Sequence, residues 1–285
     1  MESIAMKSLK TPLRYPGGKS RAITKMSQFF PDLNGYYQFR EPFLGGGSVA
    51  LWVTKQYPDI LVWVNDLYEP LYNFWNQVQI RGDLLQEQLL EIKTKNNDRD
   101  KAKELFQTAK EEVGDSSLSD QHRAVSFYIV NKCSFSGLTE SSSFSAQASE
   151  SNFSIRGIEK LSGYKELIKF WKITNYSYDF LLSGVQTKVK DAFIYLDPPY
   201  EIGSHLYGKK GDMHRYFDHD DFSEKCGECR QDLLVSYNSS QLVRDRFSDW
   251  KAIEYEHTYT MRSTSTYTKA QKNRKELVLL NYDLN

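Results

Sequence analysis

The segment Phe193–Tyr200 ends an apolar run with a carboxylate, two prolines and an aromatic ring, reading Phe-Ile-Tyr-Leu-Asp-Pro-Pro-Tyr. Ligands of open α/β sheets bind at the carboxyl ends of strands, so these side chains would lie at a binding edge. Because prolines fix the backbone, the Asp197 carboxylate and the Pro198 carbonyl could both accept hydrogen bonds from one exocyclic amine on a planar base. Accepting both hydrogens frees the lone pair of that nitrogen, and Tyr200 could stack on the base. The alternative is a proline-rich turn that only ends a strand.

A glycine-rich loop forms a second candidate site. Gly45 and Gly47 follow an aromatic strand and precede a helix, and Asp66 ends the next apolar strand 19 residues after Gly47. Such glycines let a ligand approach the backbone, and the acid suits the hydroxyls of an adenosine ribose. The pattern fits nicotinamide dinucleotides and S-adenosyl-L-methionine alike. Tight packing between strand and helix is the alternative.

Two other motifs are weaker. Pro16-Gly-Gly-Lys-Ser ends like a phosphate-binding loop, but Leu13 stands where that motif requires glycine. Cys226 and Cys229, with His214 and His219 upstream, could bind zinc, although a lone C-x-x-C more often belongs to a helix. We therefore expect no metal.

The elements that would position these residues alternate between strands and helices. We expect strands over 36–43, Ile60–Val64, Ala192–Leu196, Leu233–Tyr237 and Glu276–Tyr282, and helices over Tyr68–Val78 and from Ser48, with Ser48 as its cap. Mixed-charge helices are expected over 82–131. Ser134–Ser154 holds nine serines and should form a hairpin or extended loop. The fold class is thus α/β, a Rossmann-like sheet of residues 1–80 and 171–285 with an inserted, mainly helical domain over 81–170.

Composition excludes several classes of protein. With 40% hydrophobic and 14% aromatic residues, the chain is not disordered. Its 37 basic and 37 acidic residues cancel, which excludes coating of nucleic acid by bulk charge. Two stretches, 3–31 and 262–275, carry basic residues and no acid, and they could form a local footprint for nucleic acid or ordinary solvated faces. No apolar run could span a membrane, no signal peptide is evident, and three cysteines do not make a disulfide scaffold, so we expect a cytoplasmic protein without membrane contact.

Asp197-Pro-Pro-Tyr200 resembles the motif of amino-group DNA methyltransferases, and the order of segments resembles the Dam-like class of adenine-specific enzymes. The resemblance covers nearly the whole chain. The segments that carry it are Leu13–Lys19, Glu41–Gly47 with Asn65-Asp66, Asn131–Leu138 and Tyr267–Tyr282.

The resemblance implies transfer of a methyl group from S-adenosyl-L-methionine to the exocyclic amine of a flipped adenine in double-stranded DNA. It implies Asp197, Pro198 and Tyr200 as catalytic residues. The cofactor would be bound by Tyr15, Lys19, Glu41, Phe43, Gly45, Gly47, Asp66, Asp179, Phe180 and Asp197. Lys19 could pair with the carboxylate of the cofactor and Tyr15 could pack beside its sulfonium.

The insert resembles a target-recognition domain, with the serine-rich stretch as its DNA-reading hairpin. The predicted DNA-binding residues are Lys132, Ser134, Ser136, Arg156, Arg262, Lys272, Arg274 and Lys275. Because the hairpin has no Arg or Lys between Cys133 and Ile155, its target sequence cannot be copied from relatives. We expect a monomer in solution, and a cognate restriction endonuclease is an open question.

Other functions stay open from the sequence. They are a methyltransferase of RNA or of the cytosine amine, a nicotinamide-dependent dehydrogenase that uses the Gly45 loop, and a non-catalytic DNA-binding protein. Methylation at carbon 5 of cytosine needs a cysteine nucleophile, preceded in relatives by proline. Cys133, Cys226 and Cys229 follow Lys132, Lys225 and Glu228 instead, which is consistent with methylation of an amine.

Overall fold

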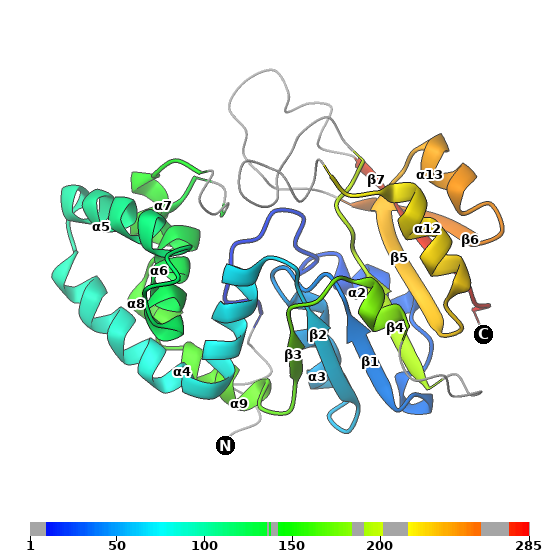
Figure 1. The fold of residues 1–285 in the computed structure, drawn as a ribbon, viewed down its shortest axis with the longest axis horizontal. Coiled ribbons are helices and arrows are strands. Elements are labelled where there is room, and N and C mark those ends of the chain that lie inside the picture. Colours follow the sequence, from blue (N-terminus) through cyan, green and yellow to red (C-terminus); the bar gives the residue numbers. More distant parts are fainter. Residues whose placement is uncertain are drawn as a thin grey trace.

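The computed structural model describes residues 10–135, 137, 142–183, 191–201, 216–257 and 274–284. Within these residues a mixed sheet has the strand order β3-β2-β1-β4-β5-β7-β6 (Figure 1). Its strands are β1 Gln38–Glu41, β2 Leu61–Asn65, β3 Lys172–Thr174, β4 Ala192–Leu196, β5 Asp232–Asn238, β6 Lys251–His257 and β7 Arg274–Leu280. The strands from β3 to β5 pair in parallel, while β7 runs antiparallel to both β5 and β6. The predicted α/β fold with a mostly parallel sheet is confirmed.

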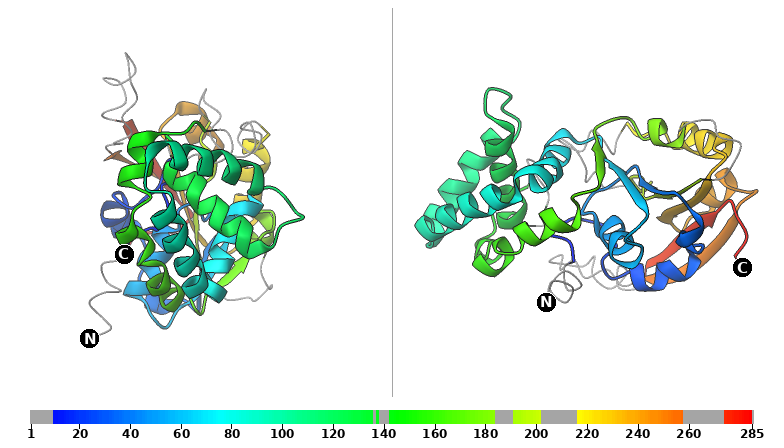
Figure 2. Two further views of the ribbon diagram at one scale, coloured as in Figure 1. Left: turned by 90° about the vertical axis from the view of Figure 1, so that its left-hand side faces the viewer. Right: turned by 90° about the horizontal axis from the view of Figure 1, so that it is seen from below.

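Helices cover both faces of the sheet, as the view from below in Figure 2 shows. All five residues of β4 are buried, which is typical of a parallel strand covered on both sides. Its side chains alternate: Phe193 and Tyr195 pack in the core with α2 (Ile23–Met26) and α3 (Ser48–Gln56). Ile194 and Leu196 pack in a second core with α10 (Asp179–Leu182) and α12 (His219–Glu228). The other helices described in this part are η1 Ser27–Phe29, η2 Leu33–Gly35 and α13 Gln241–Arg246.

The chain between β2 and β3 forms a helical body beside the sheet, seen on the left in Figure 1. Its helices are α4 Glu69–Lys95, α5 Arg99–Glu112, α6 Asp120–Cys133, α7 Ala146–Ser151, α8 Ile155–Ile158 and α9 Leu161–Leu167. The predicted helix Tyr68–Val78 is longer than expected, because α4 continues through a kink at Arg81, whose φ of −139° is not helical. One helix, α4, therefore contacts both the sheet and the other helices of the helical body.

Several predicted elements need correction. Of the hairpin or extended loop expected over Ser134–Ser154, the described residues show one bridge, between Ser134 and Phe144, followed by α7 and by Ser154 at the start of α8. Residues 136 and 138–141 lie outside the described residues. Ser145 and Ser154 cap these two helices, so part of the serine content serves helix initiation. Strands β3 and β6 were not predicted, since β3 has three residues and β6 is a charged edge strand.

The cap of α3 also differs from the prediction. Gly47, with φ of 67°, holds the N-cap position, and Ser48 is the first helical residue. The buried Glu41 carboxylate instead accepts a hydrogen bond of 2.8 Å from the Ala50 amide. An acid from β1 thus satisfies a free amide in the first turn of the helix.

Candidate active site

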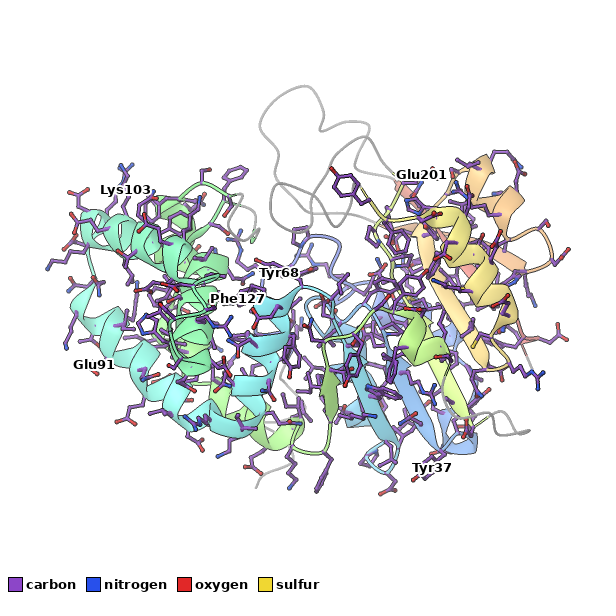
Figure 3. All side chains as sticks on the ribbon, in the orientation of Figure 1. Tyr37, Tyr68, Glu91, Lys103, Phe127 and Glu201 are labelled. Atoms are coloured by element: carbon purple, nitrogen blue, oxygen red, sulfur yellow. The ribbon has the colours of Figure 1, made fainter. Side chains whose placement is uncertain are left out.

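The carboxyl ends of β1, β2 and β4 lie side by side and bring Glu41, Asp66 and Asp197 to one edge of the sheet. Figure 3 marks this edge by Tyr68 and Glu201, which follow β2 and β4, whereas Tyr37 lies at the opposite edge. A cavity of about 380 Å³ opens here, within the range of ~300–1,000 Å³ usual for small-molecule sites.

Seven of the predicted cofactor residues line this cavity. They are Tyr15, Lys19, Glu41, Phe43, Gly45, Asp66 and Asp197. The predicted residues Gly47, Asp179 and Phe180 do not line it, while Tyr178 and Phe217, which were not predicted, do. The sequence therefore identified most of the wall formed by the strand ends, and less of the wall formed by the helices.

Asp66 accepts two backbone hydrogen bonds, one from the glycine loop and one from the residue before α4. Its carboxylate accepts from the Gly45 amide at 2.9 Å and from the Tyr68 amide at 3.0 Å. Burial raises the pKa of Asp66 to about 6, against these two hydrogen bonds, which lower it. Each carboxylate oxygen has a further lone pair, so Asp66 can accept a ligand hydroxyl as well.

The two glycines of the loop have different roles. Gly45 has φ of +49°, and a Cβ there would lie 2.9 Å from the Tyr15 ring, so a side chain would displace the aromatic wall of the cavity. A Cβ on Gly47 would lie 2.7 Å from the ring of Trp75, a buried residue of α4. Gly45 therefore shapes the cavity, whereas Gly47 permits close packing between helices.

Lys19 lies at the Asp197 carboxylate. Its side chain is 3% exposed, and Nζ is 3.0 Å from Asp197 Oδ1 and 3.7 Å from Glu276 Oε1. Burial lowers the pKa of Lys19 and the carboxylates of Asp197 and Glu276 raise it, with a net shift well upward, so Lys19 stays a cation. Burial raises the pKa of Asp197 to about 6, although Lys19 opposes the shift.

Tyr200 joins the same cluster through its hydroxyl. The hydroxyl accepts a hydrogen bond of 2.8 Å from Lys19, contacts Ser236 Oγ at 3.3 Å and donates to Glu276 at 3.3 Å. One face of the ring stacks on Tyr237 at 5.9 Å, with 25° between the planes. Two of the three predicted catalytic residues, Asp197 and Tyr200, are therefore held by this network, and the predicted stacking of Tyr200 on a base stays a prediction.

Glu276 was missed by the sequence interpretation. It is 1% exposed in β7, and it also accepts a hydrogen bond of 2.8 Å from Tyr255. The antiparallel register between β5 and β7 pairs it with Asn238 and so brings it near Asp197. An acid at the start of the apolar strand Glu-Leu-Val-Leu-Leu was the available signal.

The predicted pair Asp179 and Phe180 lies beside the cavity. Asp179 is 3.8 Å from Lys225 Nζ, and the exposed Phe180 ring contacts Tyr176 at a centroid distance of 4.6 Å. The preceding Tyr178 instead lines the cavity and stacks on Phe43, with ring centroids 5.4 Å apart and planes at 25°. These two stacked rings form an aromatic part of the cavity wall.

The predicted DNA-binding residues are only partly described. Lys132 is half-buried at the end of α6, Ser134 is buried with its hydroxyl donating to the Asn131 carbonyl, and Arg156 is exposed on α8. In the free protein Ser134 is thus turned inward. Ser136, Arg262 and Lys272 lie outside the described residues, and the description of Arg274 and Lys275 is limited to their backbone in β7.

The described part of the chain contains all three cysteines. Cys133, Cys226 and Cys229 are free thiols, and no group of three potential metal ligands occurs among the residues described. No described helix has the length and apolar character needed to cross a bilayer.

Comparisons with known proteins agree with this geometry. Residues 15–261 match the model of the family described as D12 class N6 adenine-specific DNA methyltransferase. A curated relative, the type II methyltransferase M.MjaIII of Methanocaldococcus jannaschii, is 24% identical over 204 residues, which cover 68% of this chain and 70% of the relative. The family match contains Tyr15–Lys19 before β1, the glycine loop, the helical body and Asp197.

Proposed function

The chain belongs to the D12 class of N6 adenine-specific DNA methyltransferases and methylates adenine in DNA, and on this premise we propose which residues perform the reaction and bind its partners. The methyl donor of the proposed reaction is S-adenosyl-L-methionine. The observation that carries the proposal is that Asp197, its partner Lys19 and the Gly45 loop line the same cavity.

The residues that line the cavity suit the chemistry of the proposed donor. Asp66 would accept hydrogen bonds from the ribose hydroxyls, since it already lies at the loop where the backbone comes close. Phe43 and Tyr178 would cover the adenine ring, and Tyr15 would lie beside the sulfonium. When bound, S-adenosyl-L-methionine supplies an electrophilic methyl group on a positively charged sulfur.

The Asp197 segment would bind the amine that is methylated. Its carboxylate and the Pro198 carbonyl would accept the two N–H groups of the target adenine, which orients the nitrogen lone pair for in-line displacement. Tyr200 would stack on the base. Lys19 keeps the Asp197 carboxylate ionised and fixed, so we assign it to this cluster and not to the carboxylate of the cofactor.

Such a reaction requires a base that is flipped out of the DNA double helix. The target amine is paired inside a duplex, so the adenine must be flipped at a cost of a few kcal/mol, to which DNA contacts of the protein contribute. We propose the inserted domain, residues 81–170, as the part that recognises double-stranded DNA, with Lys132 and Arg156 among its contacts. The name of the type II relative supports a cognate restriction endonuclease as partner, and we propose a monomer as the active species.

Calorimetry with Asp66 variants tests the cofactor assignment. Asp66→Ala removes the proposed ribose acceptor and should weaken binding of S-adenosyl-L-methionine by ~1.5–3 kcal/mol, the usual value for a charge-assisted hydrogen bond. DNA affinity without the cofactor should stay the same. Unchanged cofactor affinity in a folded Asp66→Ala protein would contradict the assignment.

A further inference from the structure

Asn131 joins the end of α6 to a distant segment of the chain. Its side chain is fully buried, and its amide oxygen accepts from the Arg14 amide at 2.9 Å. Its amide nitrogen donates to the Arg14 carbonyl at 2.7 Å and to the Gly137 carbonyl at 2.9 Å. One side chain therefore holds both peptide groups of Arg14, much as a paired strand would.

The turn after α6 contacts Arg14 from the other side as well. We call Ser134, Phe135 and Gly137 the recognition turn. The Arg14 guanidinium donates to the Ser134 carbonyl at 2.6 Å and to the Phe135 carbonyl at 3.1 Å. Gly137 has φ of +73°, and a Cβ there would overlap the Arg14 carbonyl oxygen, so the two segments are in direct contact.

Arg14 is the first residue of a short strap, residues 14–19, that ends in the active site. Tyr15 packs its ring against Gly45 at the cavity, the Gly18 amide donates to the Tyr15 carbonyl at 3.1 Å, and Lys19 lies 3.0 Å from Asp197. Six consecutive residues thus contact the recognition turn, the cofactor wall and the catalytic carboxylate in succession.

We propose that Asn131 is a positioning residue that couples DNA bound at the recognition turn to the cofactor cavity through this strap. The inference rests on the proposed function, because it takes the cavity as the cofactor site and the turn as a DNA contact. The side chain of Phe135 is 53% exposed, so a ligand can reach the recognition turn from solvent. Ser134 and Asn131 are buried and hold the turn from the protein interior. Any shift of the turn moves Arg14, and with it the Tyr15 wall and the Lys19 ammonium.

Coupling of this kind is reciprocal and can be measured as a ratio of dissociation constants. The probe is S-adenosylhomocysteine, the demethylated product, which binds without reacting. Its affinity is measured by calorimetry with and without a duplex that carries the site methylated by the wild type. We expect the duplex to tighten binding to the wild type by at least about fivefold, at the lower end of typical coupling.

Two variants break the connection in different ways. Asn131→Asp keeps the acceptor for the Arg14 amide but loses both donated hydrogen bonds. Gly137→Ala retains every hydrogen-bonding group and pushes on the Arg14 carbonyl. Both should reduce the effect of the duplex to less than about twofold. Gly137→Ala also serves where Asn131→Asp fails to fold.

Asn73→Asp is the matched control, because it makes the same change at another buried amide of the helical body, which donates to the Asp120 carbonyl at 2.8 Å and does not contact the strap. It should keep the coupling of the wild type. Equal coupling in Asn131→Asp, Gly137→Ala and the wild type would overturn the inference and leave the proposed function intact. A wild type that does not bind S-adenosylhomocysteine would instead contradict the proposed cofactor, and the inference with it.

Discussion

Lys19 at the sheet edge is buried and Lys132 at the end of α6 is half-buried, and their surroundings differ in charge. Two carboxylates face Lys19, and its pKa is raised well above the usual value against the effect of burial. Lys132 lies 5.2 Å from the centre of the Tyr128 ring, and no ion pair reaches it from the described part of the chain. Burial, and secondarily the charge of Arg14, lowers the pKa of Lys132 to about 8.

Lys19 is neutralised by carboxylates inside the protein, whereas Lys132 is available to an anion outside it. An internally neutralised ammonium organises the buried carboxylates of the active site. An ammonium without an internal anion gains most from an external one, and the phosphates of DNA supply such charge. In the proposed reaction the same residue type thus serves the Asp197 cluster at the sheet edge and DNA binding at the end of α6.

Removing Lys19 should have the largest effect on stability. Lys19→Met leaves Asp197 and Glu276 buried together without a cation, which should lower the free energy of unfolding by ~3–5 kcal/mol. Urea denaturation measures this change. Adding Glu276→Gln to Lys19→Met should restore part of the loss, because one of the two carboxylates is then neutral. An unchanged free energy of unfolding in Lys19→Met would contradict the role of Lys19 as the internal counterion.

Tyr200 should show a smaller effect, measured in the rate of methyl transfer. Tyr200→Ala removes a ring whose stacking on an unstacked base is worth ~1–3 kcal/mol, so the single-turnover rate should fall about 10- to 100-fold. Tyr200→Phe keeps the ring and loses the hydroxyl contacts to Lys19 and Glu276, at ~1 kcal/mol or about fivefold in rate. Full turnover by a folded Tyr200→Ala protein would exclude base stacking.

Lys132 should give the smallest effect, seen only with DNA. Lys132→Gln should make the slope of log affinity against log salt less steep by about the amount of one phosphate contact. The loss of DNA affinity should be similar for all DNA sequences. Stability should not decrease, because the folded protein already disfavours the charge, as the lowered pKa of Lys132 indicates. If the salt slope of Lys132→Gln equals that of the wild type, Lys132 does not contact a DNA phosphate.

The sequence predicts those parts of the site that depend on chain-local patterns. Asp66, Gly45 and Asp197 each end or follow an apolar strand, and parallel strands bring such ends to one edge. Glu276 depends on an antiparallel register, and Asn131 on a contact with a residue 117 positions away. Contacts of that kind are fixed by the packing of separate elements, and the local pattern of the sequence does not contain them.

The helix caps show the same division. Ser145 and Ser154 cap helices according to local rules, although the serine-rich composition concealed these helices. Ser48 stands where a local rule expects a cap, but Glu41 from β1 bonds the first turn of α3 instead. Tertiary contact decides between two chemically suitable groups, and here it favours the buried acid.

In the proposed reaction the Asp197 carboxylate, held by Lys19, accepts a hydrogen bond from the target amine during methyl transfer. The most direct test of this claim is the single-turnover rate of methyl transfer to adenine N6 by the wild type and Asp197→Asn, measured between about pH 5 and pH 8. Because the pKa of Asp197 is about 6, the rate of the wild type should fall as the pH decreases through that value and the carboxylate takes up a proton. Asp197→Asn should be slower by ~10²–10³ and lack that transition. A folded Asp197→Asn protein that matches the rate and pH profile of the wild type would contradict the claim.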